Sequence, residues 1–220
     1  MADGPRQSLL DEWYARFLND QDAATLVDQA ARRYTIGTLE RLARQGYRLT
    51  RRAAVFVLGY LADFTSNNVV GAKLIDDDRG VRLLAETAVR ALWCRDGSPS
   101  HRRLLETVIR LNVAHRYAEA IKRASELIAD APELAEAWNQ RAIALFGAGR
   151  YRESIRDCRQ ALEFNAYHFG AATGMGQCYL QLGDRENALE SLAQALRLNP
   201  GLEGVRAHVQ FLRRSRKQSE

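Results

Sequence analysis

The chain has 220 residues, with 32 basic and 27 acidic side chains, a net charge of +5 and 46% hydrophobic residues. This composition supports a folded core, and 15 glycines with four prolines are too few for collagen, a proline-rich linker or a turn-rich β protein. The longest apolar run, residues 53–62, is about half of what a membrane-spanning helix needs, so no membrane insertion is expected. The N-terminal residues lack a basic segment followed by an apolar stretch, and a secretory signal is therefore not expected.

Cysteine and histidine give little sign of metal or redox chemistry. Cys94, Cys158 and Cys178 are odd in number and lack a Cys-x-x-Cys spacing, and the four histidines form no His-Glu-x-x-His pair. We therefore expect a reduced, cytoplasmic chain without a metal or another cofactor, and core roles for Cys158 and Cys178.

The first hundred residues contain a short helical period. Residues 8–33 are predicted to form a helical pair, and the apolar segments 50–61 and 81–92 align at an offset of 31, with a short helix over 69–75 between them. The second segment resembles the HEAT-like repeat class, which often begins Asp-x-x-Val-Arg-x-x-Ala. Here the matching residues are Asp78, Val81, Arg82 and Ala85. The resemblance implies that Asp78 caps the helix that follows it.

Three consecutive acids, Asp76, Asp77 and Asp78, raise the alternative of a metal site. Calcium loops alternate their acidic ligands, because alternate residues face the ion. Consecutive acids instead favour an acidic helix start, which the helix dipole stabilises.

A joint is predicted at residues 94–100, where Gly97 would end one helix, Ser98 would cap the next and Pro99 would occupy its first turn. We expect a HEAT-like part over residues 1–97 and a second repeat part over 98–220. The loop is too short for a flexible tether, so one continuous solenoid is expected.

The second half of the sequence repeats itself at a fixed interval. The same kind of residue recurs in the pairs Tyr117 and Tyr151, Gly149 and Gly183, Ala161 and Ala195, and in the triplet Ala120, Ser154 and Ala188. The interval is the period of about 34 residues that is typical of a helix–turn–helix unit stacked on copies of itself.

These residues resemble the tetratricopeptide repeat family, in three blocks at 101–134, 135–168 and 169–202. The resemblance implies an all-α, right-handed α-solenoid of antiparallel helix pairs. The small residues Val108, Ala142 and Gly176 would let the paired helices approach closely, and a helix containing Val205, Val209, Phe211 and Leu212 would cap the last repeat. Arg141 stands where the family prefers leucine. Its head group would either reach solvent or pair with an acid on a neighbouring helix.

In this family the first helix of each unit lines a concave groove. The resemblance implies a peptide-binding groove that is largely apolar with neutral polar side chains. It would consist of Leu105, Ile109, Asn112, Asn139, Ile143, Phe146, Thr173, Gln177 and Leu180. The carboxylate clamp of chaperone adaptors is disfavoured, because Leu105, Ile109, Gly170 and Gly174 occupy the clamp positions. A helical or extended apolar segment of another protein suits such a groove better, unless the chain's own N-terminal units or C-terminal helix fill it.

Four functional hypotheses follow. The first is a non-catalytic scaffold or adaptor that binds a protein segment. The second is nucleic-acid binding, since only three of the 32 basic residues are lysines and arginine recognises phosphate well. The third is an enzyme or lyase-type chaperone, which has the least support because no nucleophile is presented. The fourth is that the chain is one subunit of a larger assembly.

The excess charge lies in the last fifteen residues, with five basic groups and one acid, and the basic tail comprises Arg213, Arg214, Arg216 and Lys217. This placement favours a cationic tail over a basic DNA-binding body.

Overall fold

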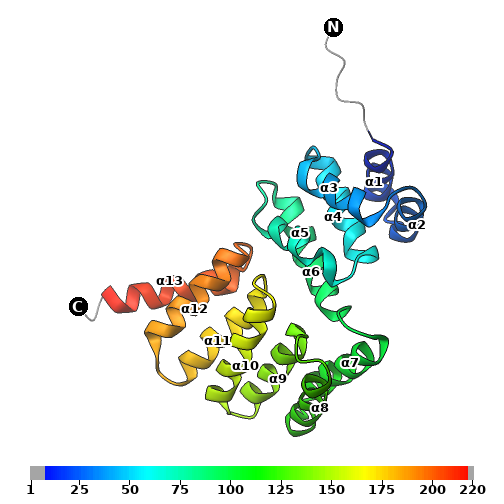
Figure 1. Ribbon diagram of the computed structural model, residues 1–220. Coiled ribbons are helices and arrows are strands. Elements are labelled where there is room, and N and C mark those ends of the chain that lie inside the picture. The colour runs from blue at the N-terminus through cyan, green and yellow to red at the C-terminus, as the bar shows by residue number, and fades with distance from the viewer. Residues whose placement is uncertain (1–7, 218–220) are drawn as a thin grey trace. The chain divides into compact units, whose positions relative to one another are not determined.

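The computed structural model describes residues 8–217, and its side chains over residues 8–214. In this part of the chain there are thirteen α-helices, two short 3₁₀ turns and no strand (Figure 1). The prediction of an all-α fold built from helix pairs is confirmed. The helices form two compact units that divide between Leu92 and Trp93, so the last two residues of α6 belong to the second unit.

The first unit is built around α4. Its helices are α1 (Leu9–Asp20), α2 (Ala23–Arg33), α3 (Ile36–Gln45), α4 (Arg48–Leu61), α5 (Asn67–Gly71) and α6 (Arg79–Cys94), with 3₁₀ turns at Phe64–Ser66 and Ala72–Ile75. Helix α4 packs against α1, α2 and α3, because its apolar residues face several directions and Val55, Val57 and Leu58 are all fully buried. The predicted pair within 8–33 and the short helical segment at 69–75 are both present.

The three consecutive aspartates anchor the start of α6. Asp78 caps the helix by accepting a hydrogen bond from the Val81 backbone N–H at 2.9 Å, as predicted. The same carboxylate accepts two hydrogen bonds from the Arg52 guanidinium, at 2.6 and 2.7 Å. Asp76 pairs with Arg51 at 2.8 Å and with Lys73 at 3.2 Å. The aspartates therefore fasten α6 to α4, which explains their position at a helix start.

These ion pairs predict acid sensitivity of the first unit. The Arg52 hydrogen bonds lower the pKa of Asp78 to about 2. Burial opposes ionisation of Asp76, but hydrogen bonds led by the one from Arg51 outweigh it and lower its pKa to about 2 as well. Because both pKa values lie below the unfolded value of about 4, their stabilisation is complete above pH ~4 and is lost as the pH falls through about 2.

We expect Asp78→Asn to lower the stability at pH 7 by about 1–2 kcal/mol and to flatten the acid limb of the pH–stability curve. Urea unfolding followed by circular dichroism between pH 2 and 7 measures both effects. Glu190→Gln, an exposed substitution in the second unit, is the control and should leave the curve unchanged. An unaltered acid limb in Asp78→Asn would contradict this assignment.

The second unit consists of helix pairs followed by a single helix. The pairs are α7 (Pro99–Val113) with α8 (Tyr117–Asp130), α9 (Ala135–Gly147) with α10 (Tyr151–Phe164), and α11 (Phe169–Gln181) with α12 (Arg185–Leu198), and the last helix is α13 (Glu203–Lys217). Each helix packs on the next, and α9 also contacts α7 and α11 (Figure 1). The predicted start of this series is correct, since Ser98 accepts a hydrogen bond from the His101 N–H, Gly97 has φ +71° and Pro99 opens α7.

Close approach of paired helices depends on small side chains at the repeat interval. The Ser154 hydroxyl is buried and donates to the Ala142 carbonyl at 2.8 Å, which fixes α10 against α9. At Gly176 an added Cβ would lie 2.6 Å from Leu192 Cγ, so no larger residue fits between α11 and α12. The predicted role of these small residues is confirmed.

Helix α13 covers the apolar edge of α12, as expected of a capping helix. Val205, Val209 and Leu212 are buried in one cluster with Leu192 of α12. The sequence predicts that Phe211 belongs to the same apolar edge, but the residue is 66% exposed. The reason is helical geometry, because positions 205, 209 and 212 share one face of the helix and position 211 does not.

Arg141 joins three helices. Its guanidinium donates two hydrogen bonds to the Asp157 carboxylate of α10, at 2.7 and 2.9 Å, and one to the Ser125 hydroxyl of α8 at 3.0 Å. The guanidinium also lies over the Trp138 ring, 4.9 Å from the ring centroid. Of the two expectations for this departure from the family pattern, pairing with a neighbouring acid is correct.

The turns inside the repeats share a left-handed residue. Gly149 and Gly183 have φ of +74° and +76°, and His115, at the equivalent position of the first repeat, has φ +57°. A side chain is strained in this conformation, so the first repeat carries a cost that the other two avoid.

We expect Gly149→Ala and Gly183→Ala each to lower stability by about 1 kcal/mol, and His115→Gly to raise it by up to about 1 kcal/mol. Urea unfolding midpoints measure the changes. Gly204→Ala is the matched control, since this glycine lies in α13 with nothing within 4 Å of an added Cβ, and alanine should stabilise the helix there. A loss of stability in His115→Gly would show that the hydrogen bond of the imidazole to the Tyr117 hydroxyl, at 2.6 Å, outweighs the strain.

Candidate functional site

The predicted groove residues form three rows on α7, α9 and α11, and each row recurs once per repeat. One row continues onto α13, and three of its four side chains are exposed to solvent. We call Ile109, Ile143, Gln177 and Phe211 the exposed row. Ile109 is half-buried, Ile143 is 44% exposed, Gln177 is exposed and Phe211 is 66% exposed. Val113, one turn after Ile109, is 75% exposed.

The second row, Leu105, Asn139 and Thr173, is largely closed. Leu105 belongs to the core cluster between α7, α8 and α9. The Asn139 amide is buried and donates to Glu136 at 3.2 Å. The half-buried Thr173 donates its hydroxyl proton to the Phe169 carbonyl at 2.8 Å.

The third row, Asn112, Phe146 and Leu180, also packs inward. The Asn112 amide is buried and donates to the backbone carbonyl and side-chain oxygen of Gln140, both at 2.9 Å. Phe146 is half-buried with its ring centroid 5.4 Å from that of Tyr151, and Leu180 packs on the α12–α13 cluster. Of the predicted groove residues, the structure therefore leaves the exposed row most accessible.

A buried polar chain runs beneath these rows. His168 Nε2 lies 2.8 Å from Glu136 Oε2, and both side chains are more than nine-tenths buried. Glu136 Oε1 also accepts hydrogen bonds from Gln140 at 2.7 Å and from Asn139 at 3.2 Å. Burial opposes the charge on Glu136, but these hydrogen bonds, that from His168 foremost, keep its pKa below the ordinary value.

The proton on His168 can be assigned from its second nitrogen. His168 Nδ1 accepts a hydrogen bond from the Ala171 backbone N–H at 3.1 Å, which caps the start of α11. A nitrogen that accepts carries no proton, so Nε2 carries the proton and donates it toward Glu136. The pair therefore joins the His168 Nε2–H to the Glu136 carboxylate, and it ties the end of the middle repeat to its beginning.

Trp93 covers this pair. Its ring stacks on the His168 ring at 4.2 Å with an interplanar angle of 20°, and its centroid lies 5.2 Å from that of Phe169. Trp93 is only 3% exposed. Trp93 therefore covers the N-terminal end of α11, while Gln177, near the opposite end of that helix, is exposed to solvent.

Sequence reasoning missed Glu136, His168 and Trp93. A usable signal was the acid at Glu136 between Ala135 and Ala137, since an acid in a run of small apolar residues predicts burial and hence a partner. The histidine partner lies at the far end of the same block and becomes apparent only once the helices are packed.

The cysteines behave as structural thiols. Cys158 and Cys178 are buried in the core between α10 and α11, as expected, and burial raises the pKa of both thiols. Cys94 is exposed as a residue, but partial burial of its thiol, with a contribution from the Glu136 charge, raises its pKa to about 11. At neutral pH these thiols are protonated, which does not favour nucleophilic chemistry.

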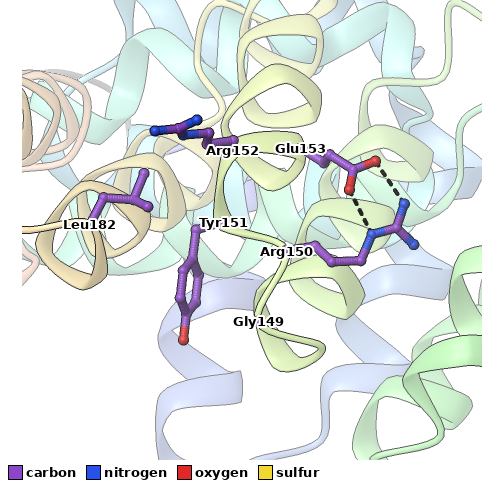
Figure 2. A pocket seen from close by; sticks show the side chains of 6 residues that line it. All are labelled: Gly149, Arg150, Tyr151, Arg152, Glu153 and Leu182. Atoms are coloured by element: carbon purple, nitrogen blue, oxygen red, sulfur yellow. Dashed lines mark hydrogen bonds and ion pairs between the residues drawn. The ribbon is translucent and has the colours of Figure 1, made fainter.

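A shallow hollow of about 310 Å³ lies at the turns of the second and third repeats. Figure 2 shows that Gly149, Arg150, Tyr151, Arg152, Glu153 and Leu182 line it. The Arg150 guanidinium and the Glu153 carboxylate pair through two hydrogen bonds of 2.7 Å, so they neutralise each other. This open hollow was not among the predicted sites.

The geometry can be compared with known proteins. The family model described as tetratricopeptide repeat matches residues 145–208, from the end of α9 into α13. Residues 145–208 of this chain are tetratricopeptide repeat sequence. The match includes the small-residue contacts of Ser154 and Gly176, and the same architecture extends back to α7 in the structure.

Three known proteins are similar in sequence to part of this chain, and the names of two of them describe TPR repeats. A TPR repeat-containing protein of Rhizobium etli is 28% identical over 137 residues, which is 62% of this chain and 66% of that protein. The TPR repeat-containing thioredoxin TTL4 of Arabidopsis thaliana is 33% identical over 37% of this chain and 12% of its own length. The Hsp70-Hsp90 organizing protein of Triticum aestivum is 30% identical over 43% of this chain and 16% of its own. The aligned region thus spans just under two thirds of the first relative and a small part of the others.

Solved structures show the same fold. The first TPR of Spaghetti (RPAP3), bound to an HSP90 peptide, superimposes with a TM-score of 0.52 at 20% identity, over 54% of this chain and 94% of that one. The Sgt2 TPR domain of Aspergillus fumigatus has a TM-score of 0.52 at 17% identity, over 56% and 82%. Within residues 8–217, no helix has the length and apolar character to cross a bilayer.

We expect His168→Ala to lower stability by about 3 kcal/mol, because it leaves the Glu136 carboxylate buried without its main partner. Unfolding midpoints in urea measure the loss. His208→Ala, at an exposed position of α13, is the matched control. The double variant Glu136→Gln/His168→Ala should recover part of the loss, and simple additivity of the two single changes would contradict a coupled pair.

Proposed function

We propose that this chain is a non-catalytic interaction module that binds a segment of another protein on the exposed row. The observation that carries the proposal is the recurrence of exposed or half-buried side chains, three of the four apolar, at the equivalent position of α7, α9, α11 and α13. Exposed apolar side chains gain stability when a partner buries them. Because these residues recur at one position of successive helices, they provide a continuous contact surface for a partner.

The contacts within the repeats favour apolar recognition. The side chains of Asn112 and Asn139 are buried and their amide nitrogens already donate within the repeats, so they are not available to grip a peptide. Ile143, Phe211 and Val113 remain accessible over 44%, 66% and 75% of their surface. We infer a helical or extended partner segment with apolar side chains at a regular spacing.

A repeat domain of the same fold binds a peptide of HSP90, as the description of the solved structure states. The fold is therefore compatible with peptide binding. The positions Leu105, Ile109, Gly170 and Gly174 provide no charged clamp in this chain, so we do not extend the HSP90 ligand itself to it.

The alternative, nucleic-acid binding through arginine, has less support. Arg51, Arg52 and Arg141 are used in ion pairs with aspartates inside the units. Arg116 and Arg150 each pair with a glutamate three residues later, at exposed turns. These contacts neutralise charges that a phosphate backbone would otherwise attract. Unpaired thiols in the core are compatible with the proposed cytoplasmic location.

The experiment selects ligands from a phage-displayed library of short random peptides on the immobilised full chain. The enriched peptides are then titrated by fluorescence anisotropy. We expect Ile143→Glu and Phe211→Glu each to weaken binding at least about tenfold, because a charge then faces an apolar contact. Circular dichroism should remain unchanged, since both side chains are exposed. Phe146 is unsuitable for this test, because it packs against the core.

Leu83→Glu is the matched control. Leu83 is 53% exposed and lies on α6 in the first unit, so it tests for a general effect of a surface glutamate. Failure to enrich any peptide, or equal binding by Ile143→Glu and wild type, would defeat the proposal.

A further inference from the structure

We propose that the segment bound on the exposed row carries an acidic side chain where it crosses α13, and that Arg214 recognises it. This inference rests on the proposed function and specifies its partner. The partner class is a protein segment that is apolar along α9 and α11 and acidic at the α13 end.

The first step is the position of Arg214. Arg214 follows Phe211 by three residues in α13, and residues three apart are neighbours on a helix surface. Both side chains are exposed, whereas Val205, Val209 and Leu212 turn toward α12. Arg214 thus extends the exposed row with a cation. Within residues 8–214 it is paired with no carboxylate.

The second step is the neutrality of the surface between α9 and α13. Helix α11 contains no charged residue. On α9, Glu136 is buried against His168 and Arg141 is paired with Asp157. A partner charge would therefore find no opposite charge along these helices. An apolar or neutral stretch fits them.

The third step is the excess of positive charge on α13. Its only acid is Glu203, at the start of the helix, while Arg206, Arg213 and Arg214 follow in the part whose side chains are described. Arg216 and Lys217, which complete the predicted basic tail, have side chains outside that part. A guanidinium binds a carboxylate through two parallel hydrogen bonds, and the adjacent Phe211 ring would partly exclude water from the pair. Charge complementarity therefore selects an acidic residue at this end of the partner.

The test uses the full chain and the same displayed peptide library. We expect the enriched peptides to combine apolar residues with Asp or Glu at one end. One enriched peptide is resynthesised with its acids replaced by amides, and a second version carries lysine there. We expect the acidic peptide to bind about fivefold more tightly than the amide version, with a difference that falls as salt rises.

Arg214→Gln should remove this preference while leaving affinity for the amide peptide unchanged. Arg213→Gln is the matched control. It makes the same change in net charge at an exposed neighbouring position, but it lies about 200° around the helix from Phe211, at about 100° per residue. We expect it to retain the preference.

The outcomes separate the two proposals. Enriched peptides that depend on Ile143 but are indifferent to acid, or to Arg214, would overturn this inference and leave the proposed function intact. No enrichment at all would overturn both. Self-association abolished by Phe211→Glu would assign the face to a second copy of the chain. Binding of a single-stranded oligonucleotide or of anionic lipid vesicles that needs Arg214 but not Ile143 would assign the cation to another ligand, and either result would overturn the inference.

Discussion

The second unit depends on the close approach of two helices at small side chains that recur once in every repeat. The buried Ser154 donates to the Ala142 carbonyl, and at Gly176 a larger residue would clash with Leu192. Because this contact recurs once in every repeat, the same position of each first helix faces away from its partner helix, and the exposed row results from that repetition.

The same regularity explains why much of this unit could be predicted from the sequence. The helix pairs, the cap at Ser98 and the close contact at Gly176 depend on local propensity and spacing, which are visible along the chain. The cap at Asp78 was predictable for the same reason. The accessibility of the groove residues was not, because Asn112 and Asn139 find hydrogen-bond partners only after the helices have packed. Phe211 was misplaced because apolar character alone does not state which helix face a residue occupies.

Several polar side chains of the repeats form hydrogen bonds and ion pairs with each other, so few of them are left to bind a partner. Glu136 would be costly to bury alone, and its hydrogen bonds to His168, Gln140 and Asn139 remove that cost. Arg141 is neutralised in the same manner by Asp157. What stays open on α9 and α11 is then mainly apolar or neutral. Specificity for a partner must then come from the spacing of the apolar side chains in the exposed row and from the cation on α13, because the charged side chains of α9 are already paired.

The pairing of Glu136 with His168 makes the middle repeat different from its two neighbours. These residues lie near the two ends of the middle block, 135–168, whereas the equivalent positions hold Arg102 and Leu134 in the block before it and Gly170 and Leu202 in the block after it. The middle block therefore contains a buried hydrogen-bonded pair that its neighbours lack, and Trp93 from outside the block covers this pair. Although the three blocks share one period, they are not interchangeable modules. Exchange of the middle block with a neighbour would remove this hydrogen-bonded pair from beneath Trp93 and so disrupt a buried contact.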